Sequence, residues 1–88
     1  MESIPISLFF PVYKDEATVT VMVEKALALL QGLSDEYEVI VVDDASPDRA
    51  GAIADELARR HERVRVIHHP VNLGYGAAVR SGLAASAF

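Results

Sequence analysis

Apolar residues follow two patterns along this chain, short runs and longer stripes with helical spacing. The runs predict three strands, at Ile6–Phe10, Tyr37–Val42 and Val64–His68. The middle run ends in β-branched residues that do not alternate with polar ones, which is typical of a parallel strand covered on both faces. Pro11 follows the first run and is expected to end that strand.

The stripes predict three helices between and after these strands. In the first, apolar residues at intervals of three and four form one wide face: Val19, Met22, Val23, Ala26, Leu27, Leu30 and Leu33. The second helix is expected to begin with Ser46 as its N-cap and Pro47 as its first residue. The third is expected over Ala77–Ala87 and onward to Phe88, with no capping glycine.

The order strand–helix, repeated three times, predicts an α/β fold with three layers, a βαβαβα unit whose parallel sheet has right-handed crossovers. We interpret residues 1–88 as a single unit that forms part of a longer domain, because three strands leave a bare sheet edge. Such an edge also predicts self-association. Ligands of these sheets bind at the carboxyl ends of the strands, here the loops 11–16, 43–48 and 72–76.

Composition excludes several classes of function. The 88 residues carry a net charge of −5 and contain no cysteine, which argues against nucleic-acid binding and against a thiolate metal site. The absence of cysteine fits a reducing, cytoplasmic compartment. No segment approaches the roughly 20 apolar residues of a membrane span. The apolar start, IPISLFFPV, lacks the basic leader of a signal peptide.

Two adjacent carboxylates, Asp43 and Asp44, follow the second predicted strand. Ionised carboxylates at a strand end accept hydrogen bonds from a ligand or contribute to a cation site. The alternative is that one of them caps the turn or the helix. Because Ser46 is available for capping, we expect at least one of the two to contact a ligand.

The other two loops allow both a binding and a structural interpretation. Tyr13 offers a flat face to a ring such as a nucleobase, whereas Asp15 and Glu16 equally fit the start of a helix. Gly74 and Gly76 permit close approach of the backbone to a ligand, and a plain turn explains them as well.

The remaining polar candidates are weaker. Arg80, in the third helix, either contacts a phosphate or is a solvated surface residue. His68 and His69 are adjacent, which is not the spacing of a helical metal pair.

Taken together, the segments PVYKDE, VVDDASPD and NLGYGAAVRSG resemble those of family 2 glycosyltransferases. The resemblance covers nearly the whole chain and is strongest to the polyprenyl-phosphate hexosyltransferases, which include dolichol-phosphate mannose synthases. It implies the N-terminal, nucleotide-binding half of a Rossmann-like catalytic domain of the GT-A type. It also implies an inverting enzyme that transfers a hexose from a nucleoside-diphosphate sugar to an acceptor such as a polyprenyl phosphate.

The resemblance implies a nucleotide site built from all three loops. Its residues would be Pro11, Tyr13, Asp15, Asp43, Asp44, Asn72, Gly74, Gly76 and Arg80. Within this set, Pro11, Tyr13 and Asp15 would line the nucleobase and ribose pocket. Asp43 would recognise the base and carry the most affinity, and Asp44 would support the same site.

The chain departs from the family pattern in two places. The family usually has asparagine at the position of Lys14. Its D-x-D metal motif follows a fourth strand, so Mg²⁺ or Mn²⁺ is expected in the full-length enzyme with ligands outside this chain. The general base is expected there too, and residues 1–88 alone are expected to transfer no sugar. A downstream anchor would place the enzyme at the cytoplasmic face of a membrane.

Three other classes compete with this interpretation. A response-regulator receiver also has an acidic pair, but after its first strand, and an aspartate ends its third strand where this chain has His68 and His69. A nicotinamide dehydrogenase would carry G-x-G-x-x-G, which fails here because position 79 is Val79. A truncated, non-catalytic nucleotide-binding module is the third.

Overall fold

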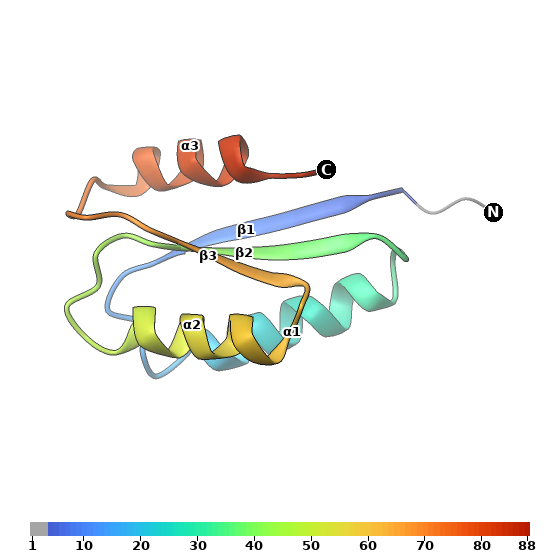
Figure 1. Ribbon diagram of the computed structural model, residues 1–88, viewed down its shortest axis with the longest axis horizontal. Coiled ribbons are helices and arrows are strands. Elements are labelled where there is room, and N and C mark those ends of the chain that lie inside the picture. Colours follow the sequence, from blue (N-terminus) through green and yellow to red (C-terminus); the bar gives the residue numbers. More distant parts are fainter. Residues whose placement is uncertain (1–3) are drawn as a thin grey trace.

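Strands and helices alternate along the chain as the sequence predicts. The computed structural model describes residues 4–88, and its elements are β1 (Ile6–Val12), α1 (Val19–Gln31), β2 (Tyr37–Asp43), α2 (Ala50–Arg60), β3 (Val64–His68) and α3 (Tyr75–Ala85) (Figure 1). The strands form one parallel sheet in the order β1-β2-β3. The predicted α/β class and parallel sheet are confirmed. Residues 1–3 of the predicted single unit lie outside the described range.

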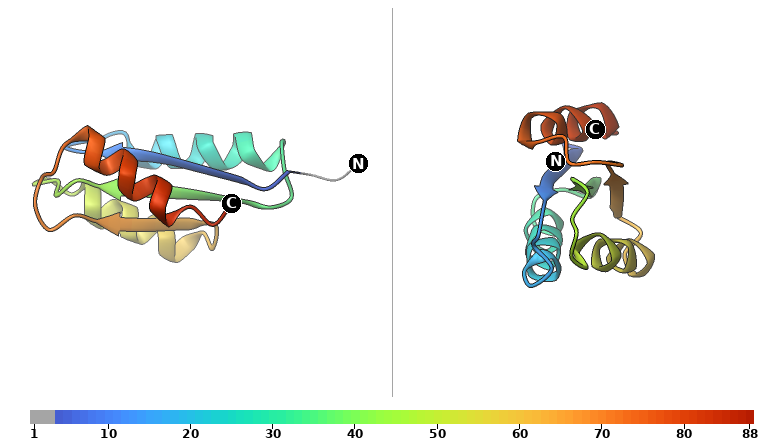
Figure 2. Two further views of the ribbon diagram at one scale, coloured as in Figure 1. Left: turned by 90° about the horizontal axis from the view of Figure 1, so that it is seen from above. Right: turned by 90° about the vertical axis from the view of Figure 1, so that its left-hand side faces the viewer.

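Helices cover both faces of this sheet, which gives the expected three layers. α1 and α2 lie side by side on one face, and α3 lies on the other (Figure 2). Side chains of β2 alternate between the two: Val39 and Val41 belong to the core under α1 and α2, while Ile40 and Val42 pack with Ala78 of α3. These four residues of β2 are each 0% exposed. Burial on both faces explains why this strand shows no polar alternation.

The first strand is longer than predicted. β1 continues to Val12, so the prediction that Pro11 ends it is wrong. Pro11 is in register with Val42, and the carbonyl of Val12 accepts a hydrogen bond from the Asp44 N–H at 3.1 Å. Proline is tolerated here because β1 pairs with only one strand among residues 4–88, so its missing N–H disrupts no ladder on the outer side.

The second helix begins later than predicted. α2 starts at Ala50, so the assignment of Ser46 and Pro47 to its first turn is wrong. The Ser46 hydroxyl instead donates to the carbonyl of Val12 at 3.4 Å and accepts from the N–H of Lys14 at 3.3 Å. A hydroxyl that bridges to the β1–α1 loop is not available to cap a helix.

The third helix both starts and ends earlier than the predicted Ala77–Ala87. Tyr75 is its first residue and Ala85 its last, so the prediction that it continues to Phe88 is wrong. Ser86 is extended, with φ −60° and ψ 126°, and its hydroxyl donates to the carbonyl of Gly82 at 2.9 Å. The chain therefore leaves α3 in an extended conformation that brings it back toward the sheet.

A buried carboxylate holds this returning segment. Glu38 of β2 accepts hydrogen bonds from the Ser7 hydroxyl at 2.6 Å, from Arg65 Nε at 2.8 Å and from the Ala87 N–H at 2.6 Å. Burial alone would raise the pKa of Glu38, but these hydrogen bonds and the charge of Arg65 outweigh it and lower the pKa. Glu38 is thus an ionised acceptor that joins both edge strands to the end of α3.

Candidate functional site

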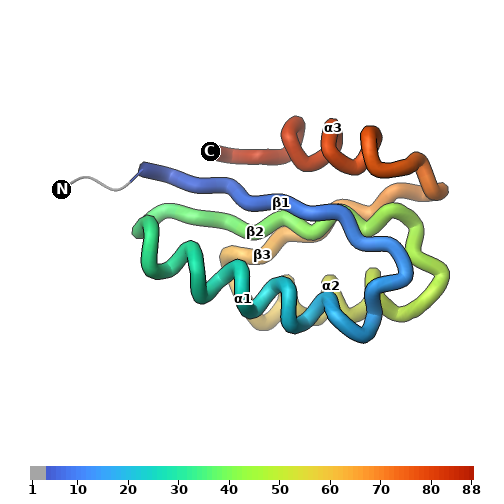
Figure 3. Tube along the Cα trace, turned by 180° about the vertical axis from the view of Figure 1, so that it is seen from behind, coloured from blue at the N-terminus to red at the C-terminus, as the bar shows by residue number. Residues whose placement is uncertain are grey.

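The three loops that follow the strands meet at one end of the sheet (Figure 3). Parallel strands place all their carboxyl ends at the same edge, which is where α/β proteins bind ligands. Asp43 and Asp44 occupy the middle of this edge, and adjacent residues of a strand point to opposite faces. Asp43 faces α2, where its carboxylate abuts Gly51, and Asp44 faces α3. The two carboxylates therefore do not confront each other.

Asp43 is 6% exposed and belongs to a chain of side chains that joins β2, β3 and α2. Its Oδ2 lies 2.8 Å from Nδ1 of His68, whose Nε2 lies 2.7 Å from Oδ1 of Asp55. Its Oδ1 accepts the N–H of Ser46 at 3.0 Å. Burial would raise the pKa of Asp43, but the hydrogen bonds with His68 and Ser46 lower it. The pKa of His68 is raised, chiefly by its hydrogen bond to Asp55 and further by Asp43, against the effect of burial.

Asp44 is 4% exposed and organises the third loop. Its Oδ1 lies 2.8 Å from Nδ1 of His69 and accepts the N–H of Leu73 at 2.9 Å. Its Oδ2 accepts the N–H of Gly74 at 2.9 Å, and its backbone carbonyl accepts Nδ2 of Asn72 at 3.4 Å. The hydrogen bond with His69, together with those from Leu73 and Gly74, lowers the pKa of Asp44 against the effect of burial.

Carboxylates also fix the first loop. Oδ2 of Asp15 accepts the N–H of Tyr13 at 3.0 Å. Asp48 links two loops, because its Oδ2 accepts the N–H of Glu16 at 3.2 Å and its Oδ1 accepts the N–H of Ala50 at 3.0 Å. The first and second loops are therefore joined through side chain to backbone hydrogen bonds.

Each loop contains one residue with a left-handed backbone. The φ angles are 60° at Lys14, 57° at Ala45 and 93° at Gly74. Glycine adopts this conformation without steric penalty, whereas a residue with a β-carbon loses about 1–2 kcal/mol. Strained residues of this kind cluster at ligand-binding sites, where the surrounding structure holds them.

A cleft of about 300 Å³ opens between the first and third loops. Its lining comes from all three loops: Pro11, Val12, Tyr13, Asp15, Asp44, Asn72, Gly74 and Tyr75. Two tyrosines of the lining, Tyr13 and Tyr75, are 42% and 73% exposed. Aromatic faces beside carboxylate and amide groups suit a flat ring that carries hydrogen-bonding edges.

The cleft brings together most of the residues predicted for a nucleotide site, but not all. Asp43 lies on the opposite face of the sheet, against α2. Gly76 and Arg80 lie beside each other in α3, where a β-carbon at Gly76 would meet Nη1 of Arg80 at 3.7 Å, and neither lines the cleft. The roles assigned to these three residues by resemblance stay predictions.

Several residues at this edge were not identified as partners from the sequence. Tyr75 lines the cleft, and His68 and His69 each bind one of the adjacent aspartates. The pairing of these histidines with the aspartates could have been inferred from the strand alignment, because His68 is in register with Asp43 on the neighbouring parallel strand. Two histidines and two aspartates that end adjacent strands necessarily lie close together.

The acidic residues of the loops do not form a metal centre. Within residues 4–88, no group of three or more histidine, cysteine, aspartate or glutamate side chains is arranged to hold a metal ion. Asp43 and Asp44 are instead engaged with imidazoles and backbone N–H groups. The residues described here do not fit a resident Mg²⁺ or Mn²⁺ ion.

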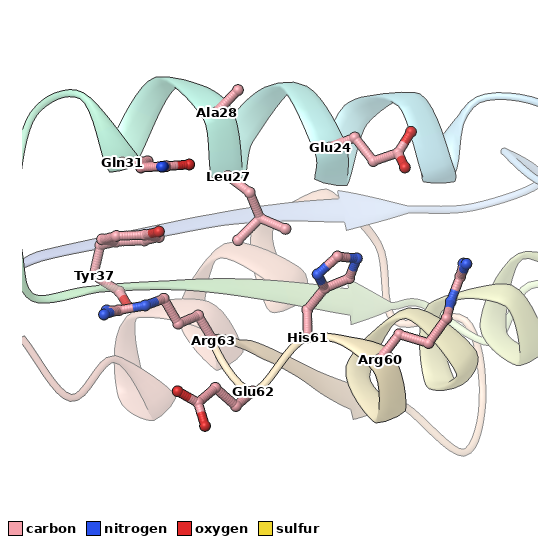
Figure 4. A pocket seen from close by; sticks show the side chains of 9 residues that line it. All are labelled: Glu24, Leu27, Ala28, Gln31, Tyr37, Arg60, His61, Glu62 and Arg63. Carbon is pink, nitrogen blue, oxygen red and sulfur yellow. The ribbon is translucent and has the colours of Figure 1, made fainter.

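A second cleft, of about 450 Å³, lies at the other end of the sheet, between α1 and the α2–β3 connection (Figure 4). It is lined by Glu24, Leu27, Ala28, Gln31, Tyr37, Arg60, His61, Glu62 and Arg63. The guanidinium of Arg63 stacks 4.1 Å from the centroid of the Tyr37 ring and donates to the Tyr37 carbonyl at 3.2 Å. Two acidic and two basic side chains balance each other there, so this cleft indicates no particular class of ligand.

Comparison with known proteins assigns the class to which this fold and site belong. Residues 7–87 match the family model described as glycosyl transferase family 2, a range that contains all three strand-end loops. The chain therefore belongs to glycosyl transferase family 2, and the resemblance noted in the sequence is confirmed.

Individual relatives agree with this assignment. The chain is 34% identical over 77 residues to dolichyl-phosphate beta-glucosyltransferase ALG5C of Trichomonas vaginalis, which covers 82% of this chain and 23% of the relative. It is 38% identical over 81 residues to the uncharacterized glycosyltransferase EpsJ of Bacillus subtilis, covering 92% and 22%. It is 35% identical over 88 residues to human dolichyl-phosphate beta-glucosyltransferase, covering 92% and 27%.

This chain thus spans about a quarter of the length of these relatives. Within residues 4–88, no helix is both long and apolar enough to cross a membrane.

Proposed function

We propose that the cleft between the first and third loops binds the nucleoside diphosphate of a sugar donor. The observation that carries this proposal is the composition of the cleft: all three strand-end loops contribute to it, in a chain of glycosyl transferase family 2. The cleft combines two exposed tyrosine rings with carboxylate, amide and backbone groups. A nucleoside has the complementary features, a flat ring, polar edges and hydroxyls.

The cleft suggests a division of roles. Tyr13 and Tyr75 would hold the base between apolar faces, and Asp15 would accept from the ribose hydroxyls. Asp44 is the other carboxylate on the cleft wall and the one that ends the central strand's side of the cleft, which supports it as the acceptor for an N–H of the base. Gly74, at φ 93°, leaves its backbone open to close approach by the diphosphate.

The whole protein would be an inverting glycosyltransferase. An oxygen of an acceptor such as a polyprenyl phosphate would attack the anomeric carbon of the hexose, while the bond from that carbon to the diphosphate breaks. The dolichyl-phosphate transferases among its relatives support this acceptor class.

We expect the whole protein to act in the cytoplasm or at the cytoplasmic face of a membrane. A divalent cation would offset the charge of the departing diphosphate, with ligands other than the residues described here.

Calorimetric titration of the chain with uridine diphosphate and with guanosine diphosphate tests the binding role. We expect one of the two to bind, and Tyr13→Ala to weaken binding by about tenfold, since stacking on an aromatic ring contributes about 1–3 kcal/mol per base. Glu62→Gln, in the second cleft, is the matched control and should bind like the parent. The proposal fails if neither nucleotide binds at millimolar concentration, or if Glu62→Gln weakens binding as much as Tyr13→Ala does.

A further inference from the structure

Asp44, the residue after β2, is one end of a continuous series of hydrogen bonds that reaches the middle of α3. Nδ1 of His69 lies 2.8 Å from Oδ1 of Asp44, and Nε2 of His69 lies 2.7 Å from the hydroxyl of Ser81. His69 and Asp44 side chains are both 6% exposed. Solvent therefore competes little for these hydrogen bonds, and each imidazole nitrogen has a single partner.

The negative charge of Asp44 fixes the direction of its hydrogen bond with His69. The lowered pKa of Asp44 keeps it ionised at neutral pH, and an ionised carboxylate only accepts. Nδ1 of His69 must therefore carry the hydrogen that Asp44 accepts. Ser81 holds the other nitrogen, so the ring cannot turn away without losing a second hydrogen bond.

We propose that His69 and Ser81 are positioning residues that hold the Asp44 carboxylate in the orientation in which it binds the Leu73 and Gly74 N–H groups. Those two N–H groups define the turn that enters α3, and Gly74 and Asp44 both line the cleft. The shape of one cleft wall thus depends on a serine inside α3. The effect on nucleotide affinity rests on the function proposed above, whereas the effect on the turn does not.

The same order of groups, carboxylate, imidazole and serine hydroxyl, occurs in serine hydrolases, where the hydroxyl faces substrate. Here neither of the two clefts is lined by Ser81. The Ser81 hydroxyl points toward the end of the sheet, where it meets His69, and the next residue, Gly82, is buried. The arrangement accordingly positions a carboxylate and does not present a nucleophile.

Three substitutions test the hydrogen bonds between Asp44, His69 and Ser81 one at a time. Ser81→Ala removes the hydroxyl and keeps a good helix former. His69→Gln places an amide near the Nε2 position and loses the bond to Asp44, whereas His69→Asn places an amide near the Nδ1 position and restores a donor to Asp44. Ser86→Ala is the matched control, because it removes a serine hydrogen bond at the other end of α3.

Amide hydrogen exchange of the folded chain measures the result. We expect Ser81→Ala and His69→Gln to lower the protection of the Leu73 and Gly74 amides by about three- to tenfold, the effect of one lost hydrogen bond, while the Ala87 amide, held by Glu38, is unchanged. His69→Asn should recover most of that protection. Ser86→Ala should leave Leu73 and Gly74 unaffected.

Nitrogen chemical shifts of His69 provide a second measurement that needs no substitution. A hydrogen on Nδ1 is expected, and its absence would overturn the proposal. Unchanged protection of Leu73 and Gly74 in both Ser81→Ala and His69→Gln would overturn it as well. The affinity for whichever of uridine diphosphate and guanosine diphosphate binds the parent should fall in the same order as amide protection. If the parent chain binds neither nucleotide while the exchange pattern holds, the proposed function is wrong and the positioning role stands.

Discussion

Gly82 of α3 lies directly against the ring of Phe9 on β1. A β-carbon built at Gly82 would overlap the Cγ, Cδ2 and Cε2 atoms of that ring. Gly82 is buried, and Phe9 packs against the small core formed by Ile40, Val42 and Ala78. The glycine therefore sets how closely α3 approaches the sheet.

Gly82→Ala should lower the stability of the chain. Because the β-carbon would overlap three ring atoms, the cost should lie in the upper part of the range of about 1–3 kcal/mol for overpacking. That exceeds the gain of about 1 kcal/mol from replacing glycine by alanine in a helix. Thermal unfolding measures the change, at about 4–8 °C per kcal/mol for a domain of this size.

Two variants make this measurement specific. Gly32→Ala is the control, since a β-carbon at Gly32 meets only the Leu29 carbonyl at 3.6 Å, and its melting temperature should not fall. Phe9→Leu in the Gly82→Ala background should recover part of the loss. An unchanged melting temperature in Gly82→Ala would show that the Phe9 ring moves aside without cost.

Lys14→Asn should stabilise the chain by about 1 kcal/mol or less, because asparagine tolerates the left-handed backbone better than lysine. The φ of 60° at Lys14 is the reason. Lys14→Gln is the matched control: it removes the charge, and the contact of Nζ with the Tyr13 ring at 5.4 Å, without the left-handed preference. A gain in melting temperature shared by both variants would assign the effect to charge.

Stability should fall as the solution is acidified below about pH 4, the usual range of unfolded aspartate and glutamate. The pKa values of Glu38, Asp43 and Asp44 are all lowered in the folded chain. Their contribution is therefore complete above the unfolded values and is lost as pH falls through the folded ones. Glu38→Gln should make the melting temperature depend less on pH in this range. Glu56→Gln, at an exposed position of α2, is the control and should leave that dependence unchanged.

Asp44→Asn should weaken nucleotide binding more than Asp43→Asn. Asp44 lines the cleft and holds the Leu73–Gly74 turn, whereas Asp43 faces α2. Losing a charged hydrogen-bond partner costs about 1.5–3 kcal/mol, which is about ten- to a hundredfold in affinity. Calorimetry on both variants decides the order. The reverse order would support the assignment of the base to Asp43 that the family resemblance implies.

The fold was predictable because its main determinant is local. An apolar β-branched strand such as Val39–Val42, followed by acidic residues and a helical stripe, indicates a buried parallel strand wherever it occurs. The loop positions follow from that order, and within them the family resemblance indicated the cleft residues Pro11, Tyr13, Asp15 and Asn72.

The incorrect predictions of helix ends arose where a contact with a residue distant in sequence, and not the local sequence, determines the structure. Ser46 has the sequence context of an N-cap, but its hydroxyl binds Val12 and Lys14 across the β1–α1 loop. The end of α3 is set by Glu38, 49 positions before Ala87. No pattern within one helix contains that information, whereas the pairing of His68 with Asp43 follows once the strand register is known.

The attachment of α3 through the carboxylates of Glu38 and Asp44 has a consequence for the order of folding. Only Ala78 and Gly82 of this helix are buried, and the bond from the Phe88 N–H to Ser7 spans 81 positions of sequence. Contacts of such long range form slowly, because their loops must close first. We therefore expect α3 to dock last, after β1, β2 and β3 have paired. In stopped-flow kinetics, Ala78→Gly, which alters a buried side chain of α3 and none of the strands, should accelerate unfolding and leave the folding rate nearly unchanged, whereas slower folding would mean that α3 belongs to the nucleus.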